Sequence, residues 1–189
     1  MSASAAACSC PAAMRNEPEW DLRVIECQDG VPNPAQLRRA LGCFATGVAI
    51  VTTYHEGKRE GLTVNSFSSV SLDPPLVLWS LQRRAASFRN FLVSGRFVVN
   101  ILEAGQRRLS AHFARPHPDK FEGVSFADGL GGCPVLQDSL AWFECRTESA
   151  VEGGDHLVFI GRVERASFRE GAPLVFSKGA YCVPEELRE

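Results

Sequence analysis

Polar side chains are concentrated between Gly61 and Leu81, a stretch whose pattern otherwise predicts β-strands. Seven residues there carry a hydroxyl, amide or carboxylate before the Pro74-Pro75 pair: Thr63, Asn65, Ser66, Ser68, Ser69, Ser71 and Asp73. Apolar residues such as Leu62 and Phe67 alternate with them and supply surface for a core. This mixture would suit a ligand that has both a flat apolar part and a phosphate-like part. The alternative is the solvent-facing side of an antiparallel strand, where Ser and Thr bind nothing.

The residues after this polar run favour the binding interpretation. Asp73-Pro74-Pro75 predicts a rigid turn, because proline fixes its own backbone angle. Residues 76–81 (LVLWSL) are almost wholly apolar, which predicts a strand that is buried on both faces. A polar strand, a rigid turn and a buried strand in succession are typical of a pocket wall.

A second group of side chains has the chemistry of an anion site. Arg83, Arg84 and Ser87 lie at the start of a predicted short helix, whose first amides favour negative charge. Lys120 precedes Phe121 in a loop and adds another cation. Together they could hold a phosphate. Solvated charges on a loop and at a helix start are an equally good interpretation of the same residues.

One of the four histidines has a suggestive position. His156 follows Gly153-Gly154-Asp155, a turn that lets the backbone approach a ligand while the next side chain projects from a strand end. A hydrogen-bonded structural histidine is the alternative. His112 and His117 have no Cys or carboxylate at metal-ligand spacing, so surface or capping roles are predicted for them and no metal site is expected.

Composition and charge narrow the class of protein. A chain of 189 residues with 45% hydrophobic and 22% charged residues predicts one globular domain with a sizeable core. The net charge of -2 gives no excess of Lys and Arg for nucleic acid or an anionic membrane, so neither is an expected partner. No apolar run approaches the roughly 20 residues that span a bilayer, and the opening residues lack the pattern of a secretory signal. A cytoplasmic protein is therefore predicted.

The pattern of cysteines and the absence of several common motifs from the sequence exclude further classes of protein. The seven cysteines are an odd number and five are scattered singly, which predicts reduced thiols rather than a disulfide framework. Cys8-Ser-Cys10 has no matching second pair, so an accessory tail is favoured over a metal site. The chain has no GxGxxG after a strand, no phosphate loop ending in GK[ST], no HExxH and no GxSxG.

Periodicity and turn signals predict the elements that carry these residues. Residues 1–32 are interpreted as a flexible extension and residues 33–189 as the folded domain. An amphipathic helix is predicted to start at Asn33 and to stop at Gly47. The next predicted elements are a strand at 48–54, a turn at 56–58, a strand from residue 61, helices at 87–94 and 106–114, and a strand at 96–103 between those helices.

The second half of the chain is mostly strand. Three long runs, LAWFECRTESAV, HLVFIGRVERASF and PLVFSKGAYCV, have alternating polarity and are separated by turn residues. Runs of this length favour an antiparallel barrel over alternating βαβ units. The predicted fold is therefore mainly β with flanking helices, an α+β arrangement.

Several blocks, taken in order, resemble a known family. They are LRRALGCFATGVAIVTT, GLTVNSFSSVSLDPPLVLWSL, SGRFVVNIL, DKFEGV, LAWFECR, GGDHLVFIGRV and PLVFSKGAY. In this order they are similar to the flavin reductase-like family of FMN-binding split barrels, from Asn33 to about Val183. The resemblance implies a six-stranded antiparallel split barrel that forms a homodimer, binds FMN or FAD and reduces it with NADH or NADPH. It also implies a partner that receives the reduced flavin, either a flavin-dependent monooxygenase or a halogenase.

The resemblance also implies roles for residues at matching motif positions. The residues expected at the flavin ring and ribityl chain are Thr46, Gly47, Thr63, Val64, Asn65, Ser66 and Ser68. Those expected at the next strand end are Ser80, Leu81 and Gln82, and those expected at phosphate are Ser87 and Lys120, beside Phe121. His156 and Tyr181 would lie near the nicotinamide. His156 is the candidate catalytic residue, with a positioning role, because hydride transfer is the chemistry of the cofactors themselves.

Two alternatives stay open at this point. One is a flavin- or haem-binding split barrel without turnover, and the other is a flavoenzyme that acts on its own small-molecule substrate. The stretch QRRAAS varies within the family, so the choice of FMN or FAD, and of NADH or NADPH, is also open.

Overall fold

The computed structural model describes residues 25, 27–28 and 31–185. The chain divides into two compact units, residues 1–37 and residues 38–189. In the first unit β1 (Cys27–Gln28) pairs antiparallel with β2 (Val31–Pro32). The predicted flexible extension at 1–32 lies almost entirely outside the described residues, and so does the Cys8-Ser-Cys10 pair.

Helix α1 (Pro34–Leu41) begins where Asn33 predicts it. The Asn33 side-chain oxygen accepts a hydrogen bond from the backbone N–H of Ala35 at 2.9 Å, which is the pattern of a helix N-cap. The helix ends before the predicted stop at Gly47. The backbone N–H of Cys43 bonds to the carbonyl of Ala40, only three residues back, and the chain then leaves the helical path.

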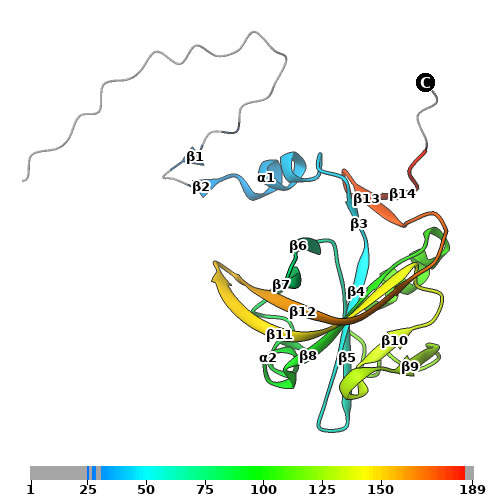
Figure 1. Ribbon diagram of the computed structural model, residues 1–189. Helices are drawn as coiled ribbons and strands as arrows, with labels where there is room; N and C mark the ends of the chain where they lie inside the picture. Colours follow the sequence, from blue (N-terminus) through cyan, green and yellow to red (C-terminus); the bar gives the residue numbers. More distant parts are fainter. Residues whose placement is uncertain (1–24, 26, 29–30, 186–189) are drawn as a thin grey trace, which may run out of the picture. The chain divides into compact units, whose positions relative to one another are not determined.

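One antiparallel sheet forms most of the second unit. Its seven strands are β4 (Ala49–His55), β5 (Lys58–Val64), β6 (Ser68–Leu72), β7 (Pro75–Gln82), β8 (Arg96–Ile101), β11 (Ala141–Gly153) and β12 (His156–Phe168). They lie in the order β5-β4-β8-β11-β12-β7-β6, and every neighbouring pair is antiparallel (Figure 1). The prediction of a mainly β, antiparallel fold is confirmed. The sheet has seven strands, however, and its edge strands β5 and β6 are not paired with each other.

These two edge strands follow each other directly in the sequence. Residues 65–67 connect them, and the four Cα-to-Cα steps from the last residue of β5 to the first of β6 span at most about 14 Å, so the sheet must curl until these strand ends approach each other. The Ser66 hydroxyl accepts the backbone N–H of Ser80 at 3.0 Å. A residue of β6 cannot serve as the partner of this N–H, because β6 starts at Ser68, which pairs with Leu78 and not with Ser80. The polar run that predicted one strand therefore forms two strands on opposite edges of the sheet.

The core contains a cluster of aromatic rings from several strands and α2. Trp79 of β7 stacks on Phe159 of β12 with ring centroids 4.9 Å apart, and it makes edge contacts with Phe91 and Phe97. All four side chains are at most 1% exposed. Along β7, buried residues alternate with half-buried ones. The prediction that this strand is buried on both faces is therefore wrong, because only one face packs into the core.

Shorter elements flank the main sheet. The predicted helices at 87–94 and 106–114 are α2 (Phe88–Ser94) and α3 (Arg107–Phe113), and the short helix η1 (Ala104–Gln106) precedes α3. The smaller sheets comprise β9 (Phe126–Asp128) with β10 (Pro134–Leu136), and β3 (Thr46–Gly47) with β13 (Val175–Ser177) and β14 (Ala180–Cys182). Helix η2 (Leu130–Gly132) lies between β9 and β10. The last predicted strand is a hairpin, because Lys178 and Gly179 have positive φ values of 49° and 82° and reverse the chain.

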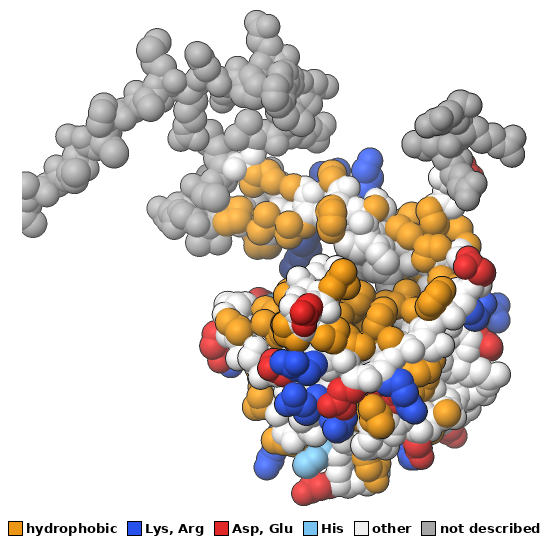
Figure 2. Space-filling view, viewed as in Figure 1, with side chains coloured by type: hydrophobic (Ala, Val, Ile, Leu, Met, Phe, Trp, Pro, Cys, Tyr) orange, Lys and Arg blue, Asp and Glu red, His pale blue; other side chains and the backbone are white. Residues whose placement is uncertain are grey.

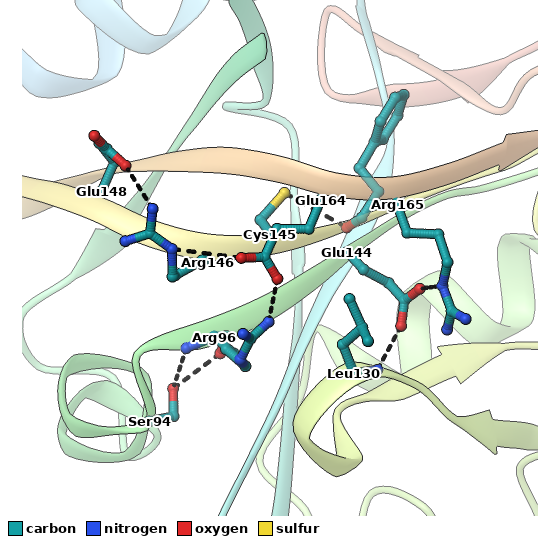
Figure 3. Close-up of polar contacts among 10 residues, drawn as sticks. Ser94, Arg96, Leu130, Glu144, Cys145, Arg146, Glu148, Glu164 and Arg165 are labelled. Carbon is teal, nitrogen blue, oxygen red and sulfur yellow. Dashed lines mark hydrogen bonds and ion pairs between the residues drawn. The ribbon is translucent and has the colours of Figure 1, made fainter. Parts of the chain in front are cut away.

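A buried carboxylate, paired with an exposed arginine, connects the segment between β9 and β10 to the main sheet (Figure 3). Glu144 of β11 is 1% exposed, and its carboxylate accepts the backbone N–H of Leu130 at 2.6 Å and pairs with Arg165 of β12. Burial alone would raise the pKa of Glu144, but Arg165, the Leu130 N–H and the charge of Arg96 together hold that pKa below its ordinary value. Arg96 also pairs with Glu164 nearer the surface.

Large hydrophobic side chains also reach the surface of the described chain, one face of which is drawn in Figure 2. Phe44, Leu72 and Phe168 are 80%, 95% and 81% exposed. Side chains of this size and exposure are unusual on a monomer when they lie in a patch, and they are typical of surfaces that a partner covers.

The cysteines whose state the structure describes are free thiols, as predicted. They are Cys43, Cys133, Cys145 and Cys182. Burial, with the charges of Glu164 and Glu144, raises the pKa of Cys145 to about 12, so its thiolate is not populated near neutral pH. Among the described residues, no helix combines the length and the apolar character that a membrane span requires.

Candidate functional site

A cleft of about 1070 Å³ lies beside the edge strand β5. Its walls are β5 and the turn before it, the segment between β7 and α2, and the loop that follows α3. Five residues predicted to bind a cofactor line it: Thr63, Gln82, Ser87, Lys120 and Phe121. Because they come from three separate parts of the sequence, the fold is what brings them together.

Lys120 is held against the wall of this cleft. Its Nζ donates hydrogen bonds to the backbone carbonyls of Gly61, at 3.0 Å, and Phe113, at 2.9 Å. Burial lowers the pKa of Lys120 from its ordinary value, and the charge of Glu60 opposes that shift. An ammonium group has three N–H donors, so one is left for another acceptor. The free donor and the positive charge suit an anionic group.

Ser87 and Gln82 lie on the segment that leads from β7 to α2. Ser87 is 7% exposed and occupies the N-cap of α2, but its side chain makes no capping hydrogen bond. Gln82 is half-buried and pairs with His156 in the β7–β12 register. Of the two predicted arginines, Arg84 lines the cleft, whereas Arg83 does not and forms an ion pair with an acidic residue of β11.

Thr63 and Tyr181 converge on Ser110, a residue that the sequence did not single out. The Thr63 hydroxyl donates to the backbone carbonyl of Ser110 at 2.6 Å, and the Ser110 hydroxyl lies 2.8 Å from the Tyr181 hydroxyl. Ser110 is fully buried on α3. The signal in the sequence was its spacing of three residues from Phe113, which places a hydroxyl on the buried face of the predicted helix.

His156 begins β12 and does not line the cleft. Its ring Nδ1 lies 2.7 Å from Oδ1 of Asp155, and its side chain is 39% exposed. The hydrogen bond and the charge of His156 lower the pKa of Asp155. His156 pairs with Gln82 of the neighbouring strand β7, and Gln82 lines the cleft.

The side chains of Val64 and Leu81, both predicted to bind the cofactor, point into the core. They are 8% and 0% exposed and belong to the hydrophobic cluster around Trp79. Strand alternation is the reason, since the preceding Thr63 and the following Gln82 take the opposite face. Val64 and Leu81 can therefore contact a ligand only through their backbone.

The remaining predicted residues do not line the cleft: Thr46, Gly47, Asn65, Ser66, Ser68, Ser80 and Tyr181. Ser66 is bonded to the backbone of Ser80, and the Ser68 hydroxyl donates to the carbonyl of Ser69. Thr46 differs from them, because its buried hydroxyl has no hydrogen-bond partner among the described residues. Such a group costs free energy, so a ligand that bonded to Thr46 would relieve that cost.

His112 and His117 have capping contacts in the loop after α3. Nε2 of His112 lies 2.8 Å from the carbonyl of Lys120, and Nδ1 of His117 lies 2.6 Å from the carbonyl of Asp119. These contacts agree with the predicted capping roles. In the part of the chain that is described, no group of three His, Cys, Asp or Glu residues comes together as a metal site would require.

Known proteins share most of this chain. The family profile described as Flavin reductase like domain matches residues 41–185. The FMN reductase (NADH) SmoA of Agrobacterium fabrum is 43% identical over 152 residues, which cover 80% of this chain and 87% of that protein. The reductase component of the flavin-dependent trigonelline monooxygenase of Acinetobacter baylyi is 40% identical over 157 residues, which cover 82% of this chain and 51% of that protein.

A solved structure has the same fold. The NADH:FAD oxidoreductase SgcE6 of Streptomyces globisporus, in complex with NAD and FAD fragments, is 39% identical with a TM-score of 0.74. The match covers 78% of this chain and 90% of that one. Some relatives are much longer, and the chain spans about half of their length.

Proposed function

The chain belongs to the flavin reductase like domain family, and we propose on that premise that it is an NAD(P)H-dependent flavin reductase. The reaction is the transfer of a hydride from NADH or NADPH to FMN or FAD. The reduced flavin then serves a separate flavin-dependent monooxygenase or halogenase. The names of the relatives support this assignment, since one is an NADH-dependent FMN reductase and another is the reductase component of a monooxygenase.

The observation that carries the proposal is the convergence of Thr63, Gln82, Ser87 and Lys120 on one cleft. Uncharged hydroxyl and amide groups suit the polar edge of a neutral ring system, and an ammonium suits phosphate. Ser87 makes no capping bond and Lys120 keeps one N–H donor, so both have capacity for a ligand. The residues present therefore fit a flavin nucleotide.

The roles of the cleft residues follow from their chemistry. When bound, the flavin supplies the hydride-accepting chemistry, and the protein has to hold two flat rings in contact. Lys120 and Ser87 would bind the phosphate, while Thr63 and Gln82 would bind polar atoms of the ring and ribityl chain. Val64 and Leu81 would contribute through backbone groups, and the bond of Ser66 to the backbone of Ser80 would help to hold the edges of the sheet in place.

We assign His156 a positioning role toward the nicotinamide. The lowered pKa of Asp155 keeps its carboxylate ionised at neutral pH, and an ionised carboxylate only accepts hydrogen bonds. Nδ1 of His156 therefore carries the hydrogen in the 2.7 Å contact, which leaves Nε2 for a ligand. Tyr181, bonded to Ser110, is proposed to border the same region.

The finer architecture is part of the same proposal. We propose that the curled sheet is the six-stranded split barrel of the family and that two chains form a homodimer. The large, exposed apolar side chains of Phe44, Leu72 and Phe168 are candidates for contact with a second subunit. A cytoplasmic location stays a prediction from the sequence.

Nicotinamide oxidation tests the proposal directly. Purified protein is mixed with NADH or NADPH and with FMN, FAD or riboflavin, and the fall in nicotinamide absorbance is compared with a protein-free control. We expect the protein to accelerate oxidation with at least one flavin. If no combination exceeds the control, the reductase assignment is wrong. A protein that keeps flavin through desalting but is not reduced by either nicotinamide would instead be a binding module without turnover.

A further inference from the structure

A carboxylate lies in the wall of the cleft, close to a residue proposed to bind phosphate. Glu60 lines the cleft, and its side chain is 14% exposed. Its Oε1 lies 2.6 Å from Nζ of Lys58 and accepts a hydrogen bond from Nδ2 of Asn90 at 3.1 Å. Two negative groups repel each other, so a carboxylate at this place does not bind a phosphate itself. Its partners indicate a structural connection instead.

The bond between Asn90 and Glu60 joins two walls of the cleft. Glu60 belongs to β5 and directly precedes Gly61, whose backbone carbonyl accepts a hydrogen bond from Nζ of Lys120 at 3.0 Å. Asn90 belongs to α2 and lies three residues after Ser87, which is about one helical turn. The bond therefore connects the strand that holds Lys120 to the helix that begins after Ser87.

The two ends of α2 are anchored differently. Its second half is fixed to the core, because Phe91 is 1% exposed and the hydroxyl of Ser94 lies 2.8 Å from the hydroxyl of Thr53 in β4. At its start, Ser87 makes no capping bond. Within the described residues, Asn90 provides the hydrogen bond that joins α2 to β5. Without that bond, the start of α2 could move relative to β5 while its second half stayed in place.

The spacing of these two walls matters because a phosphate has to meet both. Ser87 and Lys120 are proposed to bind it from separate segments, and a hydrogen bond weakens once its heavy atoms are more than about 3.2 Å apart. A shift of about 1 Å in one wall would therefore cost one of the two contacts. Riboflavin has no phosphate, so its binding would not depend on this spacing.

We propose that Asn90 is a positioning residue for the flavin phosphate, because its hydrogen bond to Glu60 holds Ser87 and Lys120 at the spacing that the phosphate requires. This inference rests on the proposed flavin reductase function. Asn90 does not line the cleft, so it acts through Glu60 and does not touch the ligand.

Flavin binding by variants of Asn90 is the first test. Dissociation constants for FMN and riboflavin are measured by flavin fluorescence for the wild-type chain and for Asn90→Leu, which cannot donate a hydrogen bond. We expect FMN binding to weaken about tenfold and riboflavin binding to be unchanged. The double variant Glu60→Gln/Asn90→Asp exchanges the amide and the carboxylate, so a hydrogen bond can form again at the same net charge. It should restore most of the lost FMN affinity.

The single variant Asn90→Asp adds a test that depends on pH. An ionised aspartate cannot donate to Glu60 but a protonated one can, and two neighbouring carboxylates raise the pKa of one of them. The FMN dissociation constant, divided by the wild-type value at the same pH, should be about tenfold above one at pH 8 and should approach one at pH 5.5. The division removes the titration of the flavin phosphate itself.

Val93→Asp is the matched control for the added charge. Val93 lies one turn further along α2, is 48% exposed and does not line the cleft. Its carboxylate has the same charge as that of Asn90→Asp but replaces no partner of Glu60. The ratio of its FMN dissociation constant to the wild-type value should therefore stay constant between the two pH values.

Three results would overturn the inference. They are an Asn90→Leu protein that binds FMN as the wild type does, an Asn90→Leu protein that loses riboflavin binding as much as FMN binding, and an Asn90→Asp protein whose ratio is the same at both pH values. If Asn90→Leu does not fold, Asn90→Asp and the double variant still decide. With any of these results, wild-type protein that oxidises nicotinamide with a flavin keeps the proposed function. Wild-type protein that neither binds a flavin nor accelerates nicotinamide oxidation would lose both.

Discussion

Replacing Arg165 with Gln should expose the cost of leaving Glu144 buried without its partner. Glu144 is 1% exposed and Arg165 is 54% exposed. Removing one member of a buried ion pair costs about 3–5 kcal/mol, and water at the exposed guanidinium side reduces that figure. We therefore expect Arg165→Gln to lower the free energy of unfolding by about 2–3 kcal/mol at pH 7. For a domain of this size, that loss corresponds to a fall of about 5–10 °C in Tm.

The dependence of this loss on pH gives a sharper test. In the wild-type chain the pKa of Glu144 is lower in the folded state than its ordinary value of 4.5. A carboxyl group of this kind stabilises the fold above its unfolded pKa, and the stabilisation is lost as pH falls through the folded pKa. In Arg165→Gln, burial becomes the dominant influence and should raise the pKa of Glu144 above its ordinary value. Ionised Glu144 then destabilises the fold at neutral pH, and this destabilisation decreases as pH falls. The destabilisation by Arg165→Gln should therefore shrink as pH falls from 7 to 4.

Urea denaturation at pH 7 and pH 4 measures both effects. The matched control is Arg162→Gln, because Arg162 pairs with Glu148 at the surface, where the two side chains are 37% and 34% exposed. That variant should lose much less stability than Arg165→Gln, because solvent screens an exposed ion pair. The double variant Glu144→Gln/Arg165→Gln should be more stable at pH 7 than Arg165→Gln alone, because no buried charge is left. Equal losses for Arg165→Gln at the two pH values would refute the argument from a buried charge.

Three further predictions concern single residues. Lys120→Met should weaken FMN and FAD binding about tenfold but leave riboflavin binding unchanged, because riboflavin lacks phosphate, and fluorescence titration measures this. His156→Ala should raise the apparent KM for the nicotinamide several-fold with little effect on flavin affinity, and steady-state kinetics with the opposite pattern would exchange the assigned roles. Gly161→Ala should cost about 1–3 kcal/mol in urea denaturation, because the added methyl group would overlap the Phe97 ring. Gly47→Ala, with nothing within 4 Å of the added atom, should be neutral.

Elements with a strong local signal were predictable from the sequence. The β-branched run at 48–54 forms β4, and the helical spacing at 87–94 and 106–114 gives α2 and α3 within one residue. The turn at Glu56-Gly57 forms as predicted, with φ values of 46° and 81° that match the twist of a two-residue hairpin. In each case the residues that decide the structure are neighbours in the chain, so periodicity and turn chemistry contain the information.

The arrangement of the strands was not predictable in the same way. The residues from Gly61 to Leu72 alternate as one strand would, yet the chain breaks at 65–67 and places β5 and β6 at opposite edges of the sheet. A hydrogen bond from the Ser80 backbone N–H to the Ser66 hydroxyl accompanies this break, and it joins residues 14 positions apart, which local periodicity does not describe. The same limit applies to Val64 and Leu81, whose inward direction depends on which face of the sheet meets the core.

The hydrogen bonds of the candidate site show what residue types alone leave undecided. A threonine hydroxyl can donate or accept, so the sequence permits either role for Thr63 toward a ligand. The structure uses its single O–H on the carbonyl of Ser110, a residue 47 positions away. Thr63 can then only accept, so the ligand atom that meets it has to be an N–H or O–H donor. The Ser110 hydroxyl also contacts the hydroxyl of Tyr181, 71 positions further along the chain. Ser110 therefore connects Thr63 to the C-terminal hairpin. A change at Ser110 would therefore alter how Thr63 meets its ligand although Ser110 itself does not line the cleft.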